Sequence, residues 1–250
     1  MITSKSNAQY KKIRKLITSS KARKEEGLFV VEGERIVKEA PLRLIDTICV
    51  SESYAASKKT LQGTLVFSDE VFRYLSDTVN PQGIMAVVRQ PSYTLEGLIK
   101  EKSEKALYLL LDDIRDPGNL GTIIRTAEAA GTDGVILSEG CADIFNPKVI
   151  RSTMGSIYRL PFVTASLCEA IGLLKKADTE VYGTALDAEL LYDQVDYAPR
   201  AAFVIGNEAR GISREVLGQV TEKIKIPMAG KVESLNAAVS AAVVLYGYRR

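Results

Sequence analysis

Short apolar runs alternate with amphipathic stretches along the first ninety residues of the chain. The apolar runs predict strands at residues 28–31, 42–50 and 83–88. The stretches before and between them predict helices at residues 7–17, 36–40 and 70–75. Turn-forming residues at 89–92 and a charged stretch at 100–105 then interrupt the pattern. We therefore expect one domain at residues 1–92 and a second at residues 104–250.

A more regular alternation follows in the second domain. Apolar runs predict strands at residues 106–111, 134–137, 159–163, 181–184, 201–205 and 223–226. Helices are expected at residues 121–130, 147–154, 168–176 and 234–249. Repeated strand–helix units favour a parallel sheet covered by helices. We therefore expect an α/β fold in both domains, the N-terminal one being the smaller.

Polar and glycine-rich segments directly follow several of the predicted strands. They lie at residues 112–119, 184–185, 206–208 and 227–230. Because ligands of parallel sheets bind beyond the carboxyl ends of the strands, these segments are expected to converge on one site. Their glycines do not form the Gly-x-Gly-x-x-Gly pattern, which argues against an ordinary dinucleotide-binding loop.

The composition narrows the chemistry of that site. Histidine is absent, which excludes Ser–His–Asp and Cys–His catalysis and any His-ligated metal. The three cysteines, Cys49, Cys141 and Cys168, are far apart and form no Cys-x-x-Cys pair, so we expect no metal and no disulfide. Each is expected to be a small apolar core residue. Acid–base chemistry must then use carboxylates, Lys, Tyr or Arg.

Membrane and secretory signals are missing from the sequence. No apolar run approaches the ~18 residues needed to span a bilayer, and residues 1–24 have no signal-peptide core. With 46% hydrophobic and 26% charged residues the composition is that of an ordinary globular protein. We expect a cytoplasmic protein without a membrane partner.

The net charge is only +2, but residues 1–24 carry eight Lys or Arg residues and no acid. A phosphate backbone is a natural partner for such a segment. A solvated terminal helix explains the same charge equally well.

Three segments of the second domain carry a family resemblance. They are residues 111–127 (LDDIRDPGNLGTIIRTA), residues 203–212 (FVIGNEARGI) and residues 226–240 (IPMAGKVESLNAAVS). In order and spacing they resemble the three motifs of the SpoU (TrmH-like) RNA methyltransferases, and the resemblance covers residues 106–250. Residues 29–33 (FVVEG) and 81–86 (PQGIMA) more weakly resemble the small substrate-binding domain that precedes the catalytic domain in many members.

The resemblance implies a fold and an activity that periodicity alone does not reveal. It implies a trefoil-knotted methyltransferase domain, where the plain pattern would predict an unknotted sheet. It also implies a homodimer and an S-adenosylmethionine cofactor. The implied reaction is methylation of a ribose 2′-hydroxyl in structured RNA, with ribosomal RNA favoured by the N-terminal domain.

Residue by residue, the resemblance also implies an active site. The implied catalytic residues are Asn119, Arg125, Glu208, Ser234 and Asn236. The implied cofactor-binding residues are Thr184, Ala185, Gly206, Ile226, Met228 and Leu235.

Several roles within this site have alternatives. Arg125 would lie nearest the attacked hydroxyl, but a charged guanidinium is a poor base, so it either has an unusual environment or binds phosphate while another group takes the proton. Glu208 either pairs with Arg125 and fixes its orientation, or is a capping carboxylate in a tight turn. Gly206 either admits the cofactor closely or serves a tight turn. Ser234 is expected to cap the last helix, with Asn236 inside its first turn.

Two other classes of protein compete with a methyltransferase. One is an RNA-binding protein without catalysis on the same fold, which the presence of Asn119, Arg125, Glu208 and Asn236 disfavours. The other is a nucleotide-dependent oxidoreductase, which the missing glycine pattern disfavours.

Overall fold

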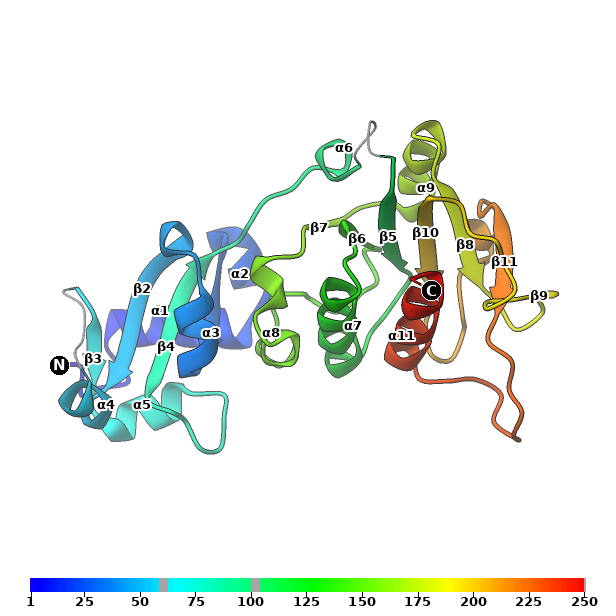
Figure 1. Cartoon of the computed structure of the whole chain (residues 1–250). Helices are drawn as coiled ribbons and strands as arrows, with labels where there is room; N and C mark the ends of the chain where they lie inside the picture. The colour runs from blue at the N-terminus through cyan, green and yellow to red at the C-terminus, as the bar shows by residue number, and fades with distance from the viewer. Residues whose placement is uncertain (59–62, 100–103, 250) are drawn as a thin grey trace. The chain divides into compact units, whose positions relative to one another are not determined.

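The computed structural model describes residues 1–58, 63–99 and 104–249 (Figure 1). The chain forms two compact units. The first contains Met1–Pro91 and Phe145–Tyr158, and the second contains Ser92–Ile144 and Arg159–Arg250. Residues 145–158, which the sequence places inside the second domain, therefore pack with the first unit.

The first unit is built on a four-stranded sheet with the order β1-β4-β2-β3. Its strands are β1 (Leu28–Glu32), β2 (Ile45–Ser51), β3 (Leu65–Phe67) and β4 (Ile84–Arg89). β4 runs antiparallel to both β1 and β2, whereas β3 is parallel to β2. The short helices of this unit are α3 (Glu34–Glu39), the 3-10 turn η1 (Leu42–Leu44), α4 (Glu52–Ser57), α5 (Asp69–Leu75), α8 (Pro147–Thr153) and the 3-10 turn η2 (Ser156–Tyr158).

The basic N-terminal segment forms two helices, α1 (Ala8–Thr18) and α2 (Ser20–Glu26), where the sequence predicted only the first. Tyr10, Ile13 and Leu16 lie at helical spacing on the buried face of α1 and join the core of the sheet. Arg23 is only 3% exposed, and it donates to the carbonyls of Leu16 and Ile17 at the end of α1. Arg14 is half-buried and donates to the carbonyl of Leu75, so both arginines have structural contacts, while the lysines of both helices remain exposed.

Helix α8 explains why residues 145–158 belong to this unit. It contacts β1, and the ring of Phe145 lies 4.8 Å from that of Phe29 on this strand. Phe29 and Val31 are both fully buried, and they alternate with Leu28 and Val30, which join the core on the α1 side. Since successive side chains of a strand point to opposite faces, α8 covers the face of β1 that α1 leaves open.

The second unit contains a seven-stranded sheet with the order β7-β6-β5-β10-β8-β11-β9. Every pairing in it is parallel. The strands are β5 (Ala106–Leu111), β6 (Gly134–Leu137), β7 (Phe162–Thr164), β8 (Glu180–Thr184), β9 (Leu190–Leu191), β10 (Arg200–Ile205) and β11 (Glu222–Lys225). Strands β5 and β10 are buried along their whole length, as the unbroken apolar runs predicted.

Helices cover both faces of this sheet (Figure 1). α6 (Leu95–Leu98), α9 (Leu167–Lys176) and α10 (Arg214–Leu217) share one core with alternate residues of β5. α7 (Pro117–Ala129) and α11 (Ala237–Tyr248) pack against each other, and α11 also contacts β10. The predicted α/β class with a large parallel sheet and a smaller N-terminal α/β unit is confirmed.

Two helix starts differ from the prediction, and both bear on the site. α7 begins at Pro117 rather than at residue 121, because Asp116 caps it and proline is well suited to the first helical position. α11 begins at Ala237 rather than at residue 234, because Asn236 is its N-cap. The expectation that Ser234 caps this helix is therefore wrong, as is the placement of Asn236 inside the first turn.

The cysteines only partly match the expectation. Cys49 is fully buried, and burial raises the pKa of its thiol to about 12. Cys141 and Cys168 are half-buried rather than core residues. All three are free thiols.

Candidate active site

A cavity of 450 Å³ lies at the carboxyl ends of β8, β10 and β11 in the second unit. Its volume falls within the range of about 300–1,000 Å³ that is usual for small-molecule sites. The walls come from residues 184–187, from the 205–212 segment, from residues 224–228 and from the start of α11. The cavity therefore forms where the topology of a parallel sheet places a ligand.

All six residues that the sequence associates with the cofactor line this cavity: Thr184, Ala185, Gly206, Ile226, Met228 and Leu235. Ile205, Ile212 and Ile224 add apolar wall, which suits an adenine ring. The hydroxyl of Thr184 donates to the carbonyl of Val204 at 3.0 Å, so toward a ligand it can only accept. The mixture of apolar wall, exposed backbone and few polar side chains fits S-adenosylmethionine.

The segment between β10 and α10 folds into a tight loop. Asn207 and Gly211 exchange two backbone hydrogen bonds of 3.0 and 2.8 Å, and the side-chain oxygen of Asn207 accepts from the backbone of Ala209 and Arg210. A Cβ on Gly206 would lie 2.2 Å from backbone atoms of Gly211 and Ile212. The tight turn therefore explains why residue 206 is a glycine, and a close approach of the cofactor is not needed to explain it.

A buried carboxylate fixes this loop to the sheet. Asp112 directly follows β5, is 7% exposed, and accepts a hydrogen bond of 2.8 Å from the backbone nitrogen of Ser213. The side-chain amide of Asn207 donates to the backbone carbonyl of Asp113 at 2.9 Å. Two contacts thus tie the cavity wall to the end of β5.

Three of the predicted catalytic residues form one hydrogen-bonded group, which we call the amide relay: Asn236, Asn119 and Glu208. Asn236 Nδ2 donates to Asn119 Oδ1 at 3.0 Å, and Asn119 Nδ2 donates to Glu208 Oε1 at 2.5 Å. Glu208 also lines the cavity, so the relay reaches the cavity wall.

Helix capping fixes the direction of the relay. Asn236 Oδ1 accepts from the backbone nitrogens of Ala238 and Val239, which leaves only the amide nitrogen free to donate onward. An ionised carboxylate can only accept, so the amide nitrogen of Asn119 must face Glu208. Both amides are therefore oriented, and Glu208 is held by a donor at a fixed position.

The other two predicted catalytic residues lie outside the relay. Ser234 lines the cavity and is exposed. Arg125 is exposed on α7, six residues after Asn119 and thus about 120° around the helix from it. Over the described ranges Arg125 makes no hydrogen bond or ion pair, and Glu208 accepts from Asn119 instead, so the suggested pair of Glu208 and Arg125 is not formed in this structure.

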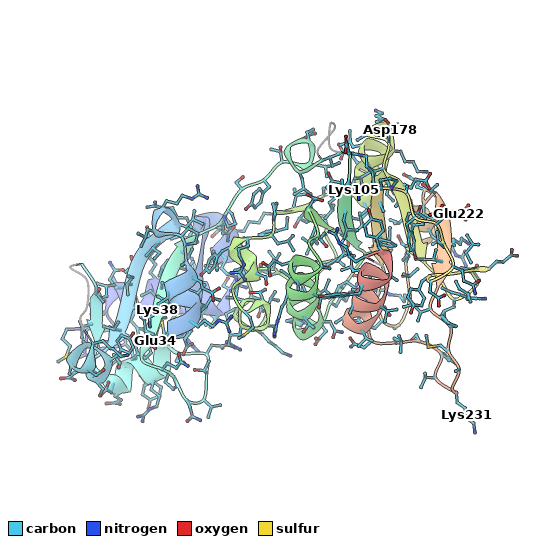
Figure 2. All side chains as sticks on the ribbon, viewed as in Figure 1. Glu34, Lys38, Lys105, Asp178, Glu222 and Lys231 are labelled. Carbon is cyan, nitrogen blue, oxygen red and sulfur yellow. The ribbon has the colours of Figure 1, made fainter. Side chains whose placement is uncertain are left out.

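Sequence reasoning missed three charged residues near the cavity. Arg210 lines it, and Arg210 and Arg115 both form ion pairs with Asp113. All three lie within the quoted motifs, yet only the fold shows that residues 113 and 210 meet. The loop before α11 extends from the body of the unit, with Lys231 near its tip (Figure 2).

The described residues were also examined for metal-binding groups and membrane-spanning helices. In the part of the chain that the structure describes, no group of three or more His, Cys, Asp or Glu side chains could hold a metal ion. No helix within the described residues is long and apolar enough to cross a bilayer.

A parallel α/β sheet with this cavity and these motifs defines the class of S-adenosylmethionine-dependent RNA methyltransferases. The chain belongs to the SpoU rRNA Methylase family, whose model matches residues 106–246. Residues 7–86 match the MRM3-like substrate binding domain.

Relatives and solved structures agree with this assignment. The chain is 36% identical to the 23S rRNA (guanosine(2553)-2′-O)-methyltransferase RlmP of Bacillus subtilis, over 99% of this chain and 98% of that protein. It is similar to an AdoMet-bound rRNA methyltransferase from Sinorhizobium meliloti, with 33% identity, a TM-score of 0.87 and coverage of 99% and 96%. The AdoMet complex of AviRb from Streptomyces viridochromogenes gives 27% identity, a TM-score of 0.85 and coverage of 96% of each chain.

Proposed function

We propose that this protein transfers the methyl group of S-adenosylmethionine to a ribose 2′-hydroxyl of ribosomal RNA. The observation that carries the proposal is the amide relay, which ends at the wall of a cavity suited to the cofactor. Relatives named for rRNA 2′-O-methylation support the choice of substrate.

The reaction needs positioning and the removal of one proton. The cofactor supplies a methyl group on a positively charged sulfur. As the 2′-oxygen bonds to the methyl carbon, the carbon–sulfur bond breaks and the hydroxyl proton must leave. An active site assists by holding the oxygen in line and by providing a proton acceptor nearby.

Glu208 is the proposed proton acceptor. Its carboxylate receives one hydrogen bond from Asn119 and lines the cavity, which leaves its remaining lone pairs available for a substrate hydroxyl. Asn119 and Asn236 are positioning residues for this carboxylate. The Ser234 hydroxyl lines the same cavity and is proposed to bind the ribose.

Arg125 is proposed to bind an RNA phosphate. Its guanidinium is exposed, and an exposed guanidinium stays charged at ordinary pH. A planar fork of donors suits a phosphate group and does not suit proton abstraction.

The first unit is proposed to bind the RNA backbone. Lys11, Lys12 and Lys15 are exposed on α1, opposite its buried face. Positive charge along one helix face favours a phosphate backbone over a merely solvated helix, because the same segment carries no acid before residue 25.

The proposed assembly is a cytoplasmic homodimer with a trefoil-knotted second unit. Val239 and Tyr246 are 47% and 51% exposed and lie seven residues apart on α11. This spacing places them on one helix face, which a second copy of the chain would cover. Light scattering of the purified protein tests the dimer.

The experiment that tests the function is methyl transfer followed by nucleoside analysis. Purified protein is incubated with labelled S-adenosylmethionine and rRNA transcripts, and the RNA is digested for mass spectrometry. We expect one 2′-O-methylated nucleoside with wild type and none with Glu208→Gln. Methylation of a base, or binding of cofactor and RNA without transfer, would refute the proposal.

A further inference from the structure

A cluster of three charged side chains stands beside the amide relay. Asp113 Oδ1 accepts from Arg115 Nε at 2.8 Å, and Asp113 Oδ2 accepts from Arg210 Nη2 at 2.6 Å. One carboxylate therefore holds two guanidinium groups. We call these three residues the arginine clamp.

The clamp differs from an ordinary surface ion pair in its charge and exposure. Two arginines and one aspartate leave a net charge of +1. The side chain of Asp113 is 21% exposed, whereas those of Arg115 and Arg210 are 65% and 64% exposed. Each guanidinium has five N–H donors, and only one of each is bonded to Asp113. Because both arginine side chains are mostly exposed, an anion in solution can reach them.

The carboxylate at the centre is held rigidly. Asp113 has a φ of 60°, in the left-handed region that Asp and Asn enter more readily than other residues with a side chain. Its backbone nitrogen donates to Ser138 Oγ at 2.9 Å, and its carbonyl accepts from Asn207 at 2.9 Å. A Cβ on Gly140 would lie 2.5 Å from Asp113 Oδ1, so the carboxylate occupies space that only glycine leaves open.

The clamp lies on the same segments as the relay. Arg115 precedes Asn119 by four residues, and Arg210 follows Glu208 by two. Arg210 also lines the cavity. An anion bound by the two guanidinium groups would therefore lie close to the part of the cavity wall that Glu208 and Arg210 form.

We propose that the arginine clamp binds a backbone phosphate of the RNA next to the methylated nucleotide. This inference rests on the proposed function, because a ribose in the site brings its flanking phosphodiesters with it. The methionine carboxylate of the cofactor is the competing anion. Arg115 does not line the cavity, and both guanidinium groups are mostly exposed, so an RNA phosphate fits better.

The test compares binding and kinetics of clamp variants on an rRNA transcript that the wild type methylates. In Arg115→Ala/Arg210→Ala, Kd and KM for RNA should rise by roughly tenfold or more at low salt, because two charge-assisted phosphate contacts are lost. The slope of log Kd against log salt should fall by about 2. The Kd for S-adenosylmethionine should stay within about twofold of wild type if phosphate is the ligand.

Arg159→Ala is the matched control. Arg159 forms an ion pair of 2.9 Å with Glu128, but it precedes β7 and so lies at the opposite end of the sheet from the cavity. It should leave RNA affinity and the salt slope unchanged. An equal loss of RNA affinity in this variant would show that the effect comes from net charge alone, and it would overturn the proposal.

Asp113→Asn separates orientation from charge. Asparagine tolerates a positive φ and keeps the backbone contacts, while the site gains one unit of positive charge. If orientation by the carboxylate matters, RNA binds more weakly despite the extra charge; tighter binding would overturn the clamp.

A cofactor Kd that rises more than the RNA Kd in Arg210→Ala would assign the clamp to the cofactor instead. If the wild type methylates none of the RNAs tested, the result refutes the proposed function rather than the clamp.

Discussion

Gly206→Ala should damage the cofactor site through a collision within the protein itself. The new Cβ would lie 2.2 Å from the carbonyl carbon of Gly211 and 2.2 Å from the nitrogen of Ile212. Both are backbone atoms, so no rotation of a side chain relieves the contact. The loop must open instead.

The magnitude follows from what opening breaks. The two backbone hydrogen bonds between Asn207 and Gly211 contribute about 0.5–1.5 kcal/mol each, and overpacking costs typically about 1–3 kcal/mol. We expect about 2–3 kcal/mol to appear as lost cofactor affinity, which is a rise in Kd of roughly 30- to 150-fold. Isothermal titration with S-adenosylmethionine measures it, and a thermal melt records the accompanying loss of stability.

Two other glycines serve as matched controls. Gly211 has open space around its Cβ position but a φ of 67°, so Gly211→Ala should cost only about 1 kcal/mol. Gly172, within α9, has open space and no positive φ, so Gly172→Ala should stabilise by about 0.5–1 kcal/mol and leave affinity unchanged. A Gly206→Ala protein that binds the cofactor like wild type, with an unchanged melt, would refute the argument.

Four further outcomes are expected. Asn236→Asp should keep the cap of α11 in a thermal melt but abolish single-turnover methyl transfer, because Asp caps as well as Asn yet cannot donate to the relay; full activity would show that only capping matters. Arg125→Ala should abolish methyl transfer with S-adenosylmethionine binding intact, and a rate recovered at saturating RNA would identify a phosphate ligand, whereas near-wild-type turnover would exclude Arg125. Replacing Lys11, Lys12 and Lys15 with Ala should weaken RNA binding and lower the salt slope by about 2–3 without changing cofactor affinity. Chelators should leave activity intact, because the sequence lacks His and clustered Cys; activity restored only by a divalent ion acting on the protein would contradict this.

The structure favours replacing the exposed lysines of α1 over deleting the whole basic segment. Deleting residues 1–24 looks reasonable from the sequence, where the segment reads as a charged terminus. Ile13 and Leu16 are each only 1% exposed, and Arg23 is buried against the end of α1. Deletion would therefore remove part of the core, and lost RNA binding would say nothing about charge. Surface lysines leave that core intact.

Local patterns predicted the elements of the fold well, and the misses have physical causes. Buried strands such as β5 and β10 gave unbroken apolar runs, which are easily recognised. Short elements such as β9 and α10 contain two and four residues, too few to show a period. The strand predicted at 159–163 begins only at Phe162, after Pro161, which has no N–H to donate to a sheet.

Motif position was enough to predict which residues gather around the cavity, but it does not show which side chains pair with one another. Five of the six predicted cofactor residues lie at or just after strand ends, whereas Leu235 precedes α11, and the topology of a parallel sheet brings strand ends together. The partner of Glu208 depends instead on which side of α7 faces the loop. Asn119 lies on that side and Arg125 does not. Both residues belong to the same motif, so the motif alone does not show which of them contacts Glu208.

The relay also depends on where two helices begin. Asp116 caps α7 and accepts from the backbone nitrogen of Asn119, which sets the first turn from which the Asn119 side chain projects. Asn236 caps α11, and α11 packs directly against α7. The relay therefore joins two helix starts separated by 117 residues in sequence. The sequence around either cap does not predict the hydrogen bond between Asn236 and Asn119. A capping asparagine uses only its side-chain oxygen for the cap, and the packing of the two helices decides which group its amide nitrogen contacts. Helix–helix packing is thus the step that turns an ordinary N-cap into a positioning residue for Glu208.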